Sequence, residues 1–374
     1  MTRDVPDYAV LILPATNKVY ADASVRLTCA ELEVFNATVL EGRLRGVVER
    51  RLAGVPYVLF SAPGLTCRDV AFLSNLSSLY ALFEIRDDLL RPVEVRPLDR
   101  FDDDLISIQK YPGKTNEYFT KLLLNVTALS TATPRDLLDR RLAVLDPLCG
   151  RGTTLNQALM YGYDAAGVDL DRKDFEAYAA FVQTWLKHKR IKHRAEAGPV
   201  RRNRAVVARR LQVTLGASKE SYRAGEVSTL TVVNTDTTRC GEFFKPAMFD
   251  VVVTDAPYGV QHGSRAAGEL SRGPAALLAA ALPVWARLLR PGGAVGIAWN
   301  THLARREQLA QTLADNSFDV LDSPPYLDFA HRVDQAITRD LIVARKPLPA
   351  APSEEPLRGA EHEDGVGGGG TLLD

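Results

Sequence analysis

Short apolar runs alternate with amphipathic segments along most of this chain of 374 residues. From about residue 142 onward, each aliphatic or β-branched run ends in a turn, and a segment with helical periodicity follows it. Runs that are apolar throughout, such as residues 251–253, are typical of strands buried on both faces of a parallel sheet. The alternation therefore predicts a doubly wound α/β sheet for this part of the chain.

The expected elements follow the same pattern. Strands are predicted at residues 142–146, 165–169, 230–233, 249–255, 294–299 and 340–344. Helices are predicted at residues 117–129, 153–159 and 274–289, the last of them stopped by the turn Arg290-Pro291-Gly292-Gly293.

Residues 8 to about 98 have a different organisation, with strand-like runs at 8–13 and 56–61 and helical patterns at 30–40 and 68–78. This pattern predicts a smaller N-terminal α+β domain, for which we take residues 1–105. The doubly wound domain then covers residues 106–346. The tail, residues 347–374, is rich in proline, glutamate and glycine, a composition typical of disorder.

Composition narrows the classes of protein. Hydrophobic residues make up 46% and charged residues 25%, which is ordinary for a soluble globular protein, and the net charge is zero. The four cysteines form no C-x-x-C pair, which argues against a disulfide framework or a zinc site, and we expect no metal. No apolar run of 18 residues and no signal-peptide pattern occurs, so no membrane association and a cytoplasmic location are predicted.

Acidic residues end three of the predicted strands. After Asp146, Gly150 and Gly152 allow a ligand to approach the backbone at the start of a helix, and Asp169 ends the next strand. An acid there can bind a ribose diol, but the third glycine of the dinucleotide fingerprint is missing, which favours an adenosyl cofactor over NAD. Asp236, after the third strand, is either an acceptor for an adenine amino group or a surface turn residue.

The run 249–255 ends abruptly in Asp255-Ala256-Pro257-Tyr258. Ligands of open α/β sheets bind at the carboxyl ends of the strands, where a carboxylate, a fixed carbonyl group and a stacking ring would suit the exocyclic amine of a nucleobase. The alternative is an aspartate that caps the next turn.

These motifs, together with the Pro-Gly-Gly turn, resemble the S-adenosylmethionine-dependent amino-methyltransferases, and most closely the group of RNA methylases that includes tRNA guanine-N2 methyltransferases. The resemblance covers about residues 107–346. It implies a Rossmann-like methyltransferase sheet, with S-adenosylmethionine as the cofactor. Two positions depart from the pattern: Ala256 replaces the usual first proline, and Leu148 stands where an aromatic residue is common.

The resemblance also implies roles for individual residues. The target base would be held by Asp255, Ala256, Pro257 and Tyr258. By the resemblance and by the strand-end argument, the cofactor would be held by Lys114, Thr115, Asp146, Cys149, Gly150, Gly152, Thr153, Asp169 and Asp236.

A basic insert, residues 187–210, separates the second and third predicted strands and carries ten Lys and Arg residues against one acid, Glu196. It is either a solvated helix face or a surface for phosphate groups. The residues expected to contact nucleic acid are Lys187, Lys189, Arg190, Arg201, Arg202 and Arg204.

Three functions remain open at this point. The first is methylation of an exocyclic amine in RNA, with guanine N2 of tRNA as the leading target. The second is methylation of adenine N6 or cytosine N4 in DNA, although about thirty residues between Gly259 and Arg290 leave no room for the usual target-recognition segment. The third is a non-catalytic RNA-binding protein that has the same fold.

Overall fold

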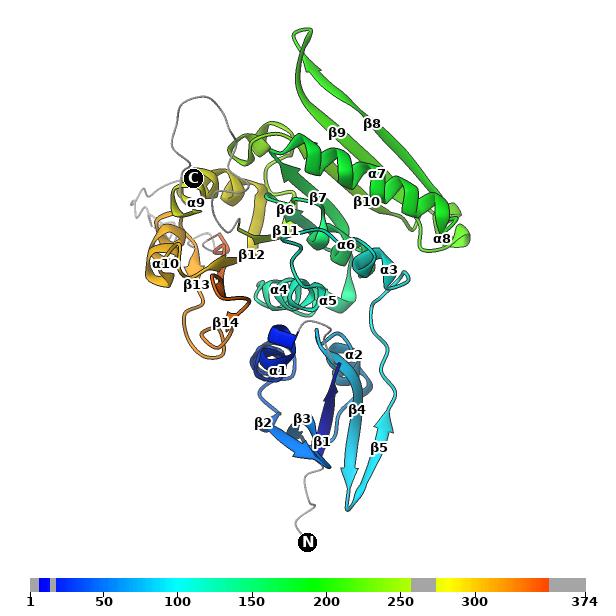
Figure 1. The fold of residues 1–374 in the computed structure, drawn as a ribbon, viewed down its shortest axis with the longest axis vertical. Helices are drawn as coiled ribbons and strands as arrows, with labels where there is room; N and C mark the ends of the chain where they lie inside the picture. Colours follow the sequence, from blue (N-terminus) through cyan, green and yellow to red (C-terminus); the bar gives the residue numbers. More distant parts are fainter. Residues whose placement is uncertain (1–6, 14–17, 257–273, 350–374) are drawn as a thin grey trace, which may run out of the picture.

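A computed structural model describes residues 7–13, 18–256 and 274–349 of the protein. Two separate β-sheets dominate the part of the chain that it describes (Figure 1). The smaller sheet comes from the N-terminal residues, and the larger one from residue 143 onward.

The N-terminal sheet is antiparallel, with the strand order β2-β3-β1-β4-β5. Its strands are β1 (Asp7–Ile12), β2 (Arg45–Leu52), β3 (Val55–Ser61), β4 (Leu79–Arg86) and β5 (Leu89–Val93). Two helices, α1 (Lys18–Thr38) and α2 (Cys67–Leu73), lie between this sheet and helix α4 of the larger part (Figure 1). The helical pattern at 30–40 is only the second half of α1, and α2 is shorter than the pattern at 68–78 suggested.

The larger sheet confirms the predicted fold class. Its strand order is β13-β15-β12-β11-β6-β7-β10-β9-β8, and the five central strands from β12 to β10 are parallel. The first of them in the chain, β6, lies at the centre: β7 and β10 follow on one side, and β11 and β12 on the other. The order thus reverses between β6 and β11, the place where open α/β sheets bind their ligands.

Where an element was predicted, its bounds are close to those expected, except that β12 begins five residues early. The strands are β6 (Ala143–Asp146), β7 (Asp164–Asp169), β10 (Ser228–Asn234), β11 (Phe249–Asp255), β12 (Leu289–Asn300), β13 (Asp319–Val320), β14 (His331–Arg332) and β15 (Thr338–Arg345). The helices are α3 (Asp104–Ser107), α4 (Glu117–Leu129), α5 (Asp136–Asp139), α6 (Thr153–Met160), α7 (Arg172–His188), α8 (Lys219–Arg223), η1 (Thr237–Glu242), α9 (Pro274–Leu288) and α10 (Arg306–Asp315).

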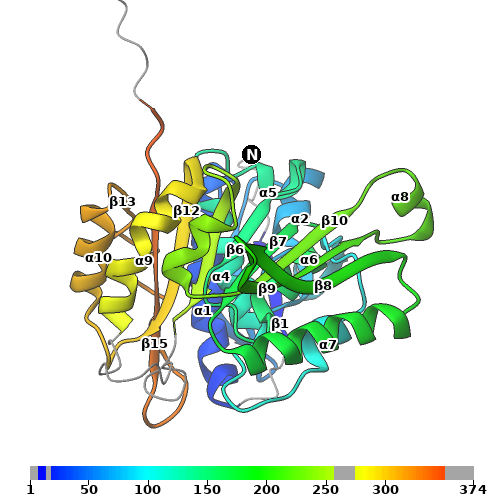
Figure 2. The same cartoon turned by 90° about the horizontal axis from the view of Figure 1, so that it is seen from above.

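The strand β11 shows why these runs are apolar at every position. Val251 and Val253 pack in one core cluster with residues of α4, α6 and α7, whereas Val252 packs in another with residues of α9, α10 and η1. Because successive side chains of a strand point to opposite faces, a strand covered by helices on both sides needs apolar residues throughout. Figure 2 shows α9 and α10 at one end of the large sheet, and α7 at the other.

The Pro-Gly-Gly prediction was wrong in one respect. Helix α9 does end at Leu288, but β12 begins at the next residue and includes Pro291, Gly292 and Gly293. The register of β12 against β11 shifts here, between the pairs Phe249–Leu289 and Val251–Ala294. The segment is therefore an irregular strand start, and no separate turn follows the helix.

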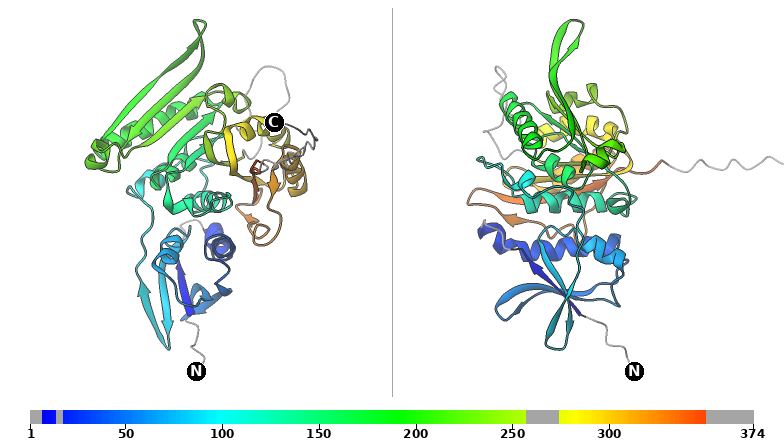
Figure 3. Two further views of the ribbon diagram at one scale, coloured as in Figure 1. Left: turned by 180° about the vertical axis from the view of Figure 1, so that it is seen from behind. Right: turned by 90° about the vertical axis from the view of Figure 1, so that its right-hand side faces the viewer.

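Most of the basic insert is a β-hairpin and not a helix face. Helix α7 ends at His188, and the following residues form a long antiparallel hairpin, β8 (His193–Arg202) and β9 (Ala205–Leu215), in which β9 pairs with β10. The hairpin thus adds two strands to the sheet. It continues to Leu215, past the predicted end of the insert at residue 210. Its tip and the N-terminal sheet lie at opposite ends of the molecule (Figure 3).

Helix α1 connects the N-terminal part to the larger one. Glu31 on α1 is fully buried and accepts a hydrogen bond from the side-chain amide of Asn125 on α4 (2.8 Å) and others from Ser77. Arg26, one and a half turns earlier, donates hydrogen bonds to the carbonyl groups of Asp328 and Ala330. The N-terminal part is therefore fixed to α4 and to the loop that leads into β14.

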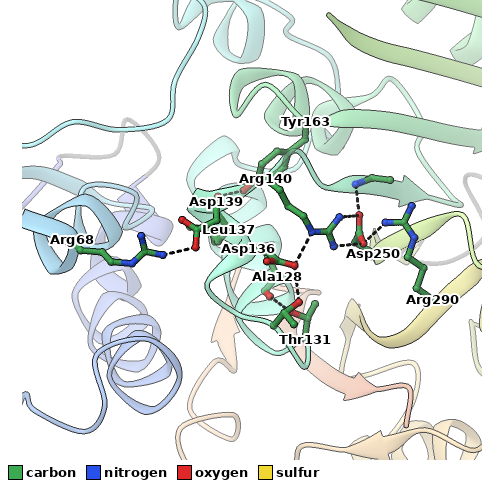
Figure 4. Close-up of polar contacts among 12 residues, drawn as sticks. Arg68, Ala128, Thr131, Asp136, Leu137, Asp139, Arg140, Tyr163, Asp250 and Arg290 are labelled. Carbon is green, nitrogen blue, oxygen red and sulfur yellow. Dashed lines mark hydrogen bonds and ion pairs between the residues drawn. The ribbon is translucent and has the colours of Figure 1, made fainter. Parts of the chain in front are cut away.

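Ion pairs close the amino end of β11 (Figure 4). Asp250 is 5% exposed and pairs with Arg140 (2.7 Å) and Arg290 (2.5 Å), while its Oδ2 accepts a hydrogen bond from the backbone N–H of Ala143 (2.7 Å). A buried carboxylate needs such partners to remain charged. None of the helices in the described part of the chain is long and apolar enough to cross a membrane.

Candidate active site

A cavity of about 400 Å³ opens at the carboxyl edge of the large sheet, above the point where the strand order reverses. Residues that follow β6, β7, β10 and β11 line it, together with the segment that precedes α4. Among the described lining residues there are six aspartates and one cation, Arg151. The aspartates are Asp146, Asp169, Asp171, Asp174, Asp236 and Asp255.

The loop between β6 and α6 is held against β7 by hydrogen bonds. Asp146 accepts hydrogen bonds from the backbone N–H of Leu148 (3.1 Å) and from the hydroxyl of Thr254 (2.9 Å). The backbone N–H of Gly150 donates to Asp169 (2.8 Å), so the acid at the end of β7 is tied directly to the glycine loop. These contacts fix the shape of the cavity floor without a ligand.

Gly152 is required for this loop on two grounds. Its φ of 80° lies in the left-handed region, and a Cβ atom at this position would come within 2.3 Å of the ring of Tyr178. Glycine therefore allows helix α6 to begin directly over the ring of a residue on α7. Thr153, the first residue of α6, lines the cavity beside it.

Cys149 has a packing role. It is buried, and a Cβ atom added at Gly167 would come within 2.8 Å of its Sγ, so the thiol lies against the backbone of β7. Burial raises the pKa of the thiol well above its ordinary value, which keeps Cys149 protonated and unsuited to act as a nucleophile.

Burial also raises the pKa of two carboxyl groups in the cavity. The pKa of Asp146 is about 7, chiefly because it is desolvated, although hydrogen bonds lower it. Desolvation likewise raises the pKa of Asp169 to about 6, against the hydrogen bonds from Asp171 and Gly150. A cation bound beside these two carboxyl groups would stabilise their ionised forms.

The segment before α4 closes the cavity from the other side. The hydroxyl of Tyr111 lies 3.2 Å from that of Thr153, and the guanidinium group of Arg151 lies over the Tyr111 ring while pairing with Asp174 (2.8 Å). The hydroxyl of Thr115 donates to Asp255 (2.6 Å). The segment therefore connects the glycine loop after β6 to the end of β11.

Lys114 faces away from this cavity. Its ammonium group donates to the carbonyl oxygen of Ile106 (2.7 Å) and lies 3.6 Å from Glu117. It lines a second, smaller cavity of about 220 Å³, and Thr115 belongs to the walls of both. Of the two predicted residues of this segment, Thr115 therefore lines the large cavity, whereas Lys114 lines only the smaller one.

Asp255 ends β11 and enters an ion pair that the sequence did not indicate. Arg339 at the start of β15 lies 3.3 Å from Asp255 Oδ2, and its side chain is 5% exposed and stacks over the ring of Phe119 at 4.7 Å. Ala256 is buried, and its N–H donates to the carbonyl oxygen of Ala298 on β12 (2.8 Å). Pro257 and Tyr258 lie outside the described residues.

Asp236 is a turn residue, as one of the two interpretations had it, and it also lines the cavity. Its Oδ1 accepts hydrogen bonds from the backbone N–H of Thr238 (2.8 Å) and from the hydroxyl of the same residue (2.6 Å), and so caps η1. Asp236 also lines the cavity opposite the β6 loop. Capping thus fixes the carboxylate at the cavity wall.

The six predicted basic residues do not form one cluster. Lys187, Lys189 and Arg190 lie at the end of α7 and the base of the hairpin, where Lys189 pairs with Asp102 (2.7 Å) and Asp104 (2.6 Å). The other three, Arg201, Arg202 and Arg204, lie at the tip. The ten residues of β8 separate the two groups by roughly 30 Å.

The tip projects beyond the edge of the sheet that carries the cavity. Asn234, the last residue of β10, pairs with Arg209, so residues 201–206 extend past the carboxyl end of β10. Arg202 donates to Glu242 (2.7 Å) and lies over the ring of Phe243, both next to η1. The hairpin tip and the cavity are therefore on the same edge of the molecule.

Several residues of the site had no local signal in the sequence. Arg339 is 84 positions from its partner Asp255 and precedes the strand that the apolar run predicted. Asp171 and Asp174 belong to the first turn of α7, where acidic residues are common for capping. Only the fold places the two aspartates at the cavity and Arg339 beside Asp255.

Comparison with known proteins agrees with the geometry. Residues 138–318, just under half of the chain, match the family described as RMKL-like, methyltransferase domain. This match identifies a methyltransferase domain in the chain, and S-adenosylmethionine is its cofactor. The chain thus has the fold and the cofactor of a methyl-transferring enzyme. No curated protein matches the sequence.

Solved structures with a similar fold include three methyltransferases. A SAM-dependent methyltransferase from Methanosarcina mazei is 14% identical, over 56% of this chain and 93% of that chain, with a TM-score of 0.31. The precorrin-6y C5,15-methyltransferase from Geobacter metallireducens is 12% identical, over 67% and 98%, with a TM-score of 0.37. The 1,6-didemethyltoxoflavin-N1-methyltransferase from Burkholderia thailandensis is 17% identical, over 64% and 93%, with a TM-score of 0.32. With TM-scores below 0.5, these similarities carry no inference about the substrate.

Proposed function

We propose that this protein transfers a methyl group from S-adenosylmethionine to an exocyclic amine of an RNA base, with guanine N2 of tRNA as the first target to test. The observation that carries the proposal is the position of Asp255. Its carboxylate lines the same cavity as the glycine loop and the strand-end acids, and it is held there by Thr115 and Arg339.

The residues of the cavity fit the cofactor. S-adenosylmethionine, when bound, supplies an electrophilic methyl group on a positively charged sulfur, and its amino-acid part carries an ammonium group. A wall with six aspartates complements both positive charges. Asp169 would accept hydrogen bonds from the ribose hydroxyls, Asp236 would accept one from the adenine amino group, and Gly150 and Gly152 would allow close approach of the backbone.

Asp255 has a defined task in such a reaction. An exocyclic amine of guanine is a poor nucleophile because its lone pair is delocalised into the ring. An N–H···O bond to Asp255, with a second to the carbonyl of Ala256, would favour a more pyramidal nitrogen and direct its lone pair. Transfer of the methyl group to that nitrogen would leave S-adenosylhomocysteine, and the amine proton that becomes acidic would pass to solvent. Orientation alone can contribute about 7 to 11 kcal/mol in favourable cases.

Arg339 would act as a positioning residue. Its guanidinium group is nearly buried and fixed over Phe119, so the ion pair holds the Asp255 side chain in one orientation. Thr115 fixes the same oxygen atom with a hydrogen bond of 2.6 Å. A carboxylate with both constraints reorganises little when the substrate amine arrives, which is the condition for efficient electrostatic catalysis.

The hairpin tip would recruit the polyanion. Arg201 and Arg204 are exposed at the cavity edge of a protein with no net charge. Asn203 and Arg204 form the two-residue turn with φ values of 48° and 66°, where glycine is the usual second residue. A left-handed arginine costs about 1 kcal/mol, which suggests that its charge is used. Phosphate contact is such a use.

A labelling experiment tests the proposal. The purified protein is incubated with tritiated S-adenosylmethionine and separate pools of tRNA, rRNA and duplex DNA, and the modified nucleoside is identified by mass spectrometry. Label in an RNA pool, as N2-methylguanosine or another N-methylated nucleoside, supports the proposal. Label in DNA alone overturns it in favour of a DNA amino-methyltransferase. The absence of label in all three pools would indicate a binding protein or another substrate.

A further inference from the structure

The smaller cavity of about 220 Å³ lies next to the site but belongs to another part of the fold. Its walls come from helix α1, the start of α4 and the β14–β15 pair. Thr115 is part of both cavities, and Arg339 joins them because it lines the small cavity and pairs with Asp255 in the large one. The side chain of Arg339 is therefore all that separates the small cavity from Asp255, the proposed amine-binding carboxylate.

A buried histidine in this cavity has an unused hydrogen-bonding atom. His331 is 4% exposed, and its Nδ1 lies 2.9 Å from the carbonyl oxygen of Phe329. Among the described residues, no group forms a hydrogen bond with its Nε2. A buried polar atom without a partner costs about 1 to 3 kcal/mol, so a ligand that supplies one would be stabilised.

The chemistry of that atom defines what it can bind. Because Nδ1 faces a carbonyl oxygen, the proton of a neutral imidazole is on Nδ1, and Nε2 is a hydrogen-bond acceptor. Burial lowers the pKa of His331 to about 4, so the ring is neutral at physiological pH. The missing partner must therefore be a donor, such as a hydroxyl or an amine.

The remaining walls suit an anion beside that donor. Cations line the cavity at Lys114, Arg332 and Arg339, against one acid, Glu117, which lies near Lys114. Asn116, which caps α4, also belongs to the wall and offers its side-chain amide there. A phosphate group with a hydroxyl beside it matches this arrangement, and a ribonucleotide next to the target carries both. The other kind of donor in a nucleotide, the amine of a base, lies far from any phosphate.

The histidine is held rigidly. His331 pairs with Arg339 in the β14–β15 ladder, and its ring contacts the rings of Phe119 (centroids 5.0 Å apart) and Tyr20 (6.1 Å). Arg26 of α1 fixes the loop before it through the carbonyl groups of Asp328 and Ala330. The N-terminal part thus helps to build the cavity as well as to contribute Tyr20.

We infer that this cavity is a subsite for the ribose-phosphate of the nucleotide next to the target, in which His331 Nε2 accepts a hydrogen bond from the ribose 2′-hydroxyl. This inference rests on the proposed function, because it assumes that a nucleic acid enters beside Asp255. It makes the small cavity the place where RNA is distinguished from DNA, which lacks that hydroxyl.

The test compares matched probes. The full chain, saturated with S-adenosylhomocysteine, is titrated with a fluorescein-labelled single-stranded 15-nucleotide RNA of mixed sequence and with its 2′-deoxy counterpart of the same bases. One hydrogen bond should make RNA binding about five-fold tighter. His331→Phe should remove this preference by weakening RNA binding without changing DNA binding. His331→Gln, which retains an acceptor near the position of Nε2, should restore part of it.

A matched control comes from another histidine. His193 also has its Nδ1 2.7 Å from the carbonyl oxygen of the residue two positions earlier, but it lies in the hairpin, outside the cavity. His193→Phe should leave the RNA-to-DNA ratio unchanged. Arg332→Gln should weaken binding of both probes to the same extent and reduce the salt dependence by about one phosphate contact. Titration with S-adenosylhomocysteine verifies that each variant is folded.

The outcomes separate the two proposals. Equal affinity of the natural protein for both probes overturns the subsite inference, whether or not the variants fold. The same holds for an RNA preference that His331→Phe leaves intact, even if tRNA is methylated. Label in DNA alone, together with an RNA preference that depends on His331, would overturn the proposed reaction but retain the subsite.

Discussion

Replacing Asp255 by asparagine should separate catalysis from stability. The change removes the charge that balances Arg339, whose side chain is 5% exposed, and offers N–H donors where the substrate amine needs an acceptor. Breaking a buried pair costs about 3 to 5 kcal/mol. Because Asp255 is 15% exposed and asparagine keeps an oxygen for Thr115, we expect a loss of about 3 kcal/mol in the free energy of unfolding.

The decrease in kcat should be larger than the loss in the free energy of unfolding explains. Removing one preorganised hydrogen-bonding group from a transition state typically costs about 100- to 1000-fold in kcat. The assay is single-turnover transfer of tritiated methyl groups to tRNA, expressed per folded molecule, with the folded fraction taken from titration with S-adenosylhomocysteine. Cofactor affinity should remain within about three-fold of the natural protein, since Asp255 would contact the substrate amine and not the cofactor.

The same strand offers a matched control. Asp250 is the second residue of β11, five residues and about 17 Å before Asp255. It also pairs with arginines (Figure 4), and its side chain is 5% exposed. Asp250→Asn should destabilise the protein by about 3 to 5 kcal/mol and leave kcat per folded molecule unchanged. If both variants lose kcat equally, the loss reflects disturbed packing of β11. Undiminished kcat in Asp255→Asn would remove Asp255 from the proposed role.

Three further predictions concern other parts of the site. Gly152→Ala should lower the free energy of unfolding by more than about 2 kcal/mol and abolish cofactor binding. Gly113→Ala, with the same φ of 80° but open space around it, should lower it by only about 1 kcal/mol. Equal losses in thermal unfolding would contradict the steric argument. Affinity for S-adenosylmethionine should rise about ten-fold from pH 5.5 to 8, because a cation favours the ionised forms of Asp146 (pKa about 7) and Asp169 (pKa about 6). Calorimetry should show a smaller rise for S-adenosylhomocysteine, which lacks the sulfonium charge. An affinity that does not change with pH would rule out this coupling. Arg201→Gln combined with Arg204→Gln should reduce the slope of log affinity against log salt for RNA by about 2, while Lys187→Gln combined with Arg190→Gln, at the other edge, should leave it unchanged.

The sequence was a good guide wherever a local pattern determines the structure. The apolar runs of the central strands, the glycine loop after Asp146 and the acids at the strand ends follow from burial on two faces and from backbone conformation, which involve few residues at a time. The helix at 117–129 was predicted with the bounds that α4 has, because Asn116 supplies an N-cap and the leucines of the helix are buried.

The hairpin and the long-range contacts could not be predicted in this way. Strand β8 contains Gly198 and Pro199, and most of its residues are exposed, so it has no apolar run that would predict a strand. It is an edge strand, where such residues are tolerated. Arg339 and His331 gain their roles only from partners that the fold brings close, and a sequence pattern gives no information on such partners.

The contact of Arg26 with the loop before β14 has a consequence for biosynthesis. All strand pairs of the N-terminal sheet lie within residues 7–93, so this sheet can form early, but Arg26 bonds to a carbonyl group 302 residues later. At about 5 to 20 residues per second, a ribosome needs about 15 to 60 s to deliver that partner. During this interval the loop before β14 is absent from the nascent chain, so the contacts of Arg26 cannot form until most of the chain has been made.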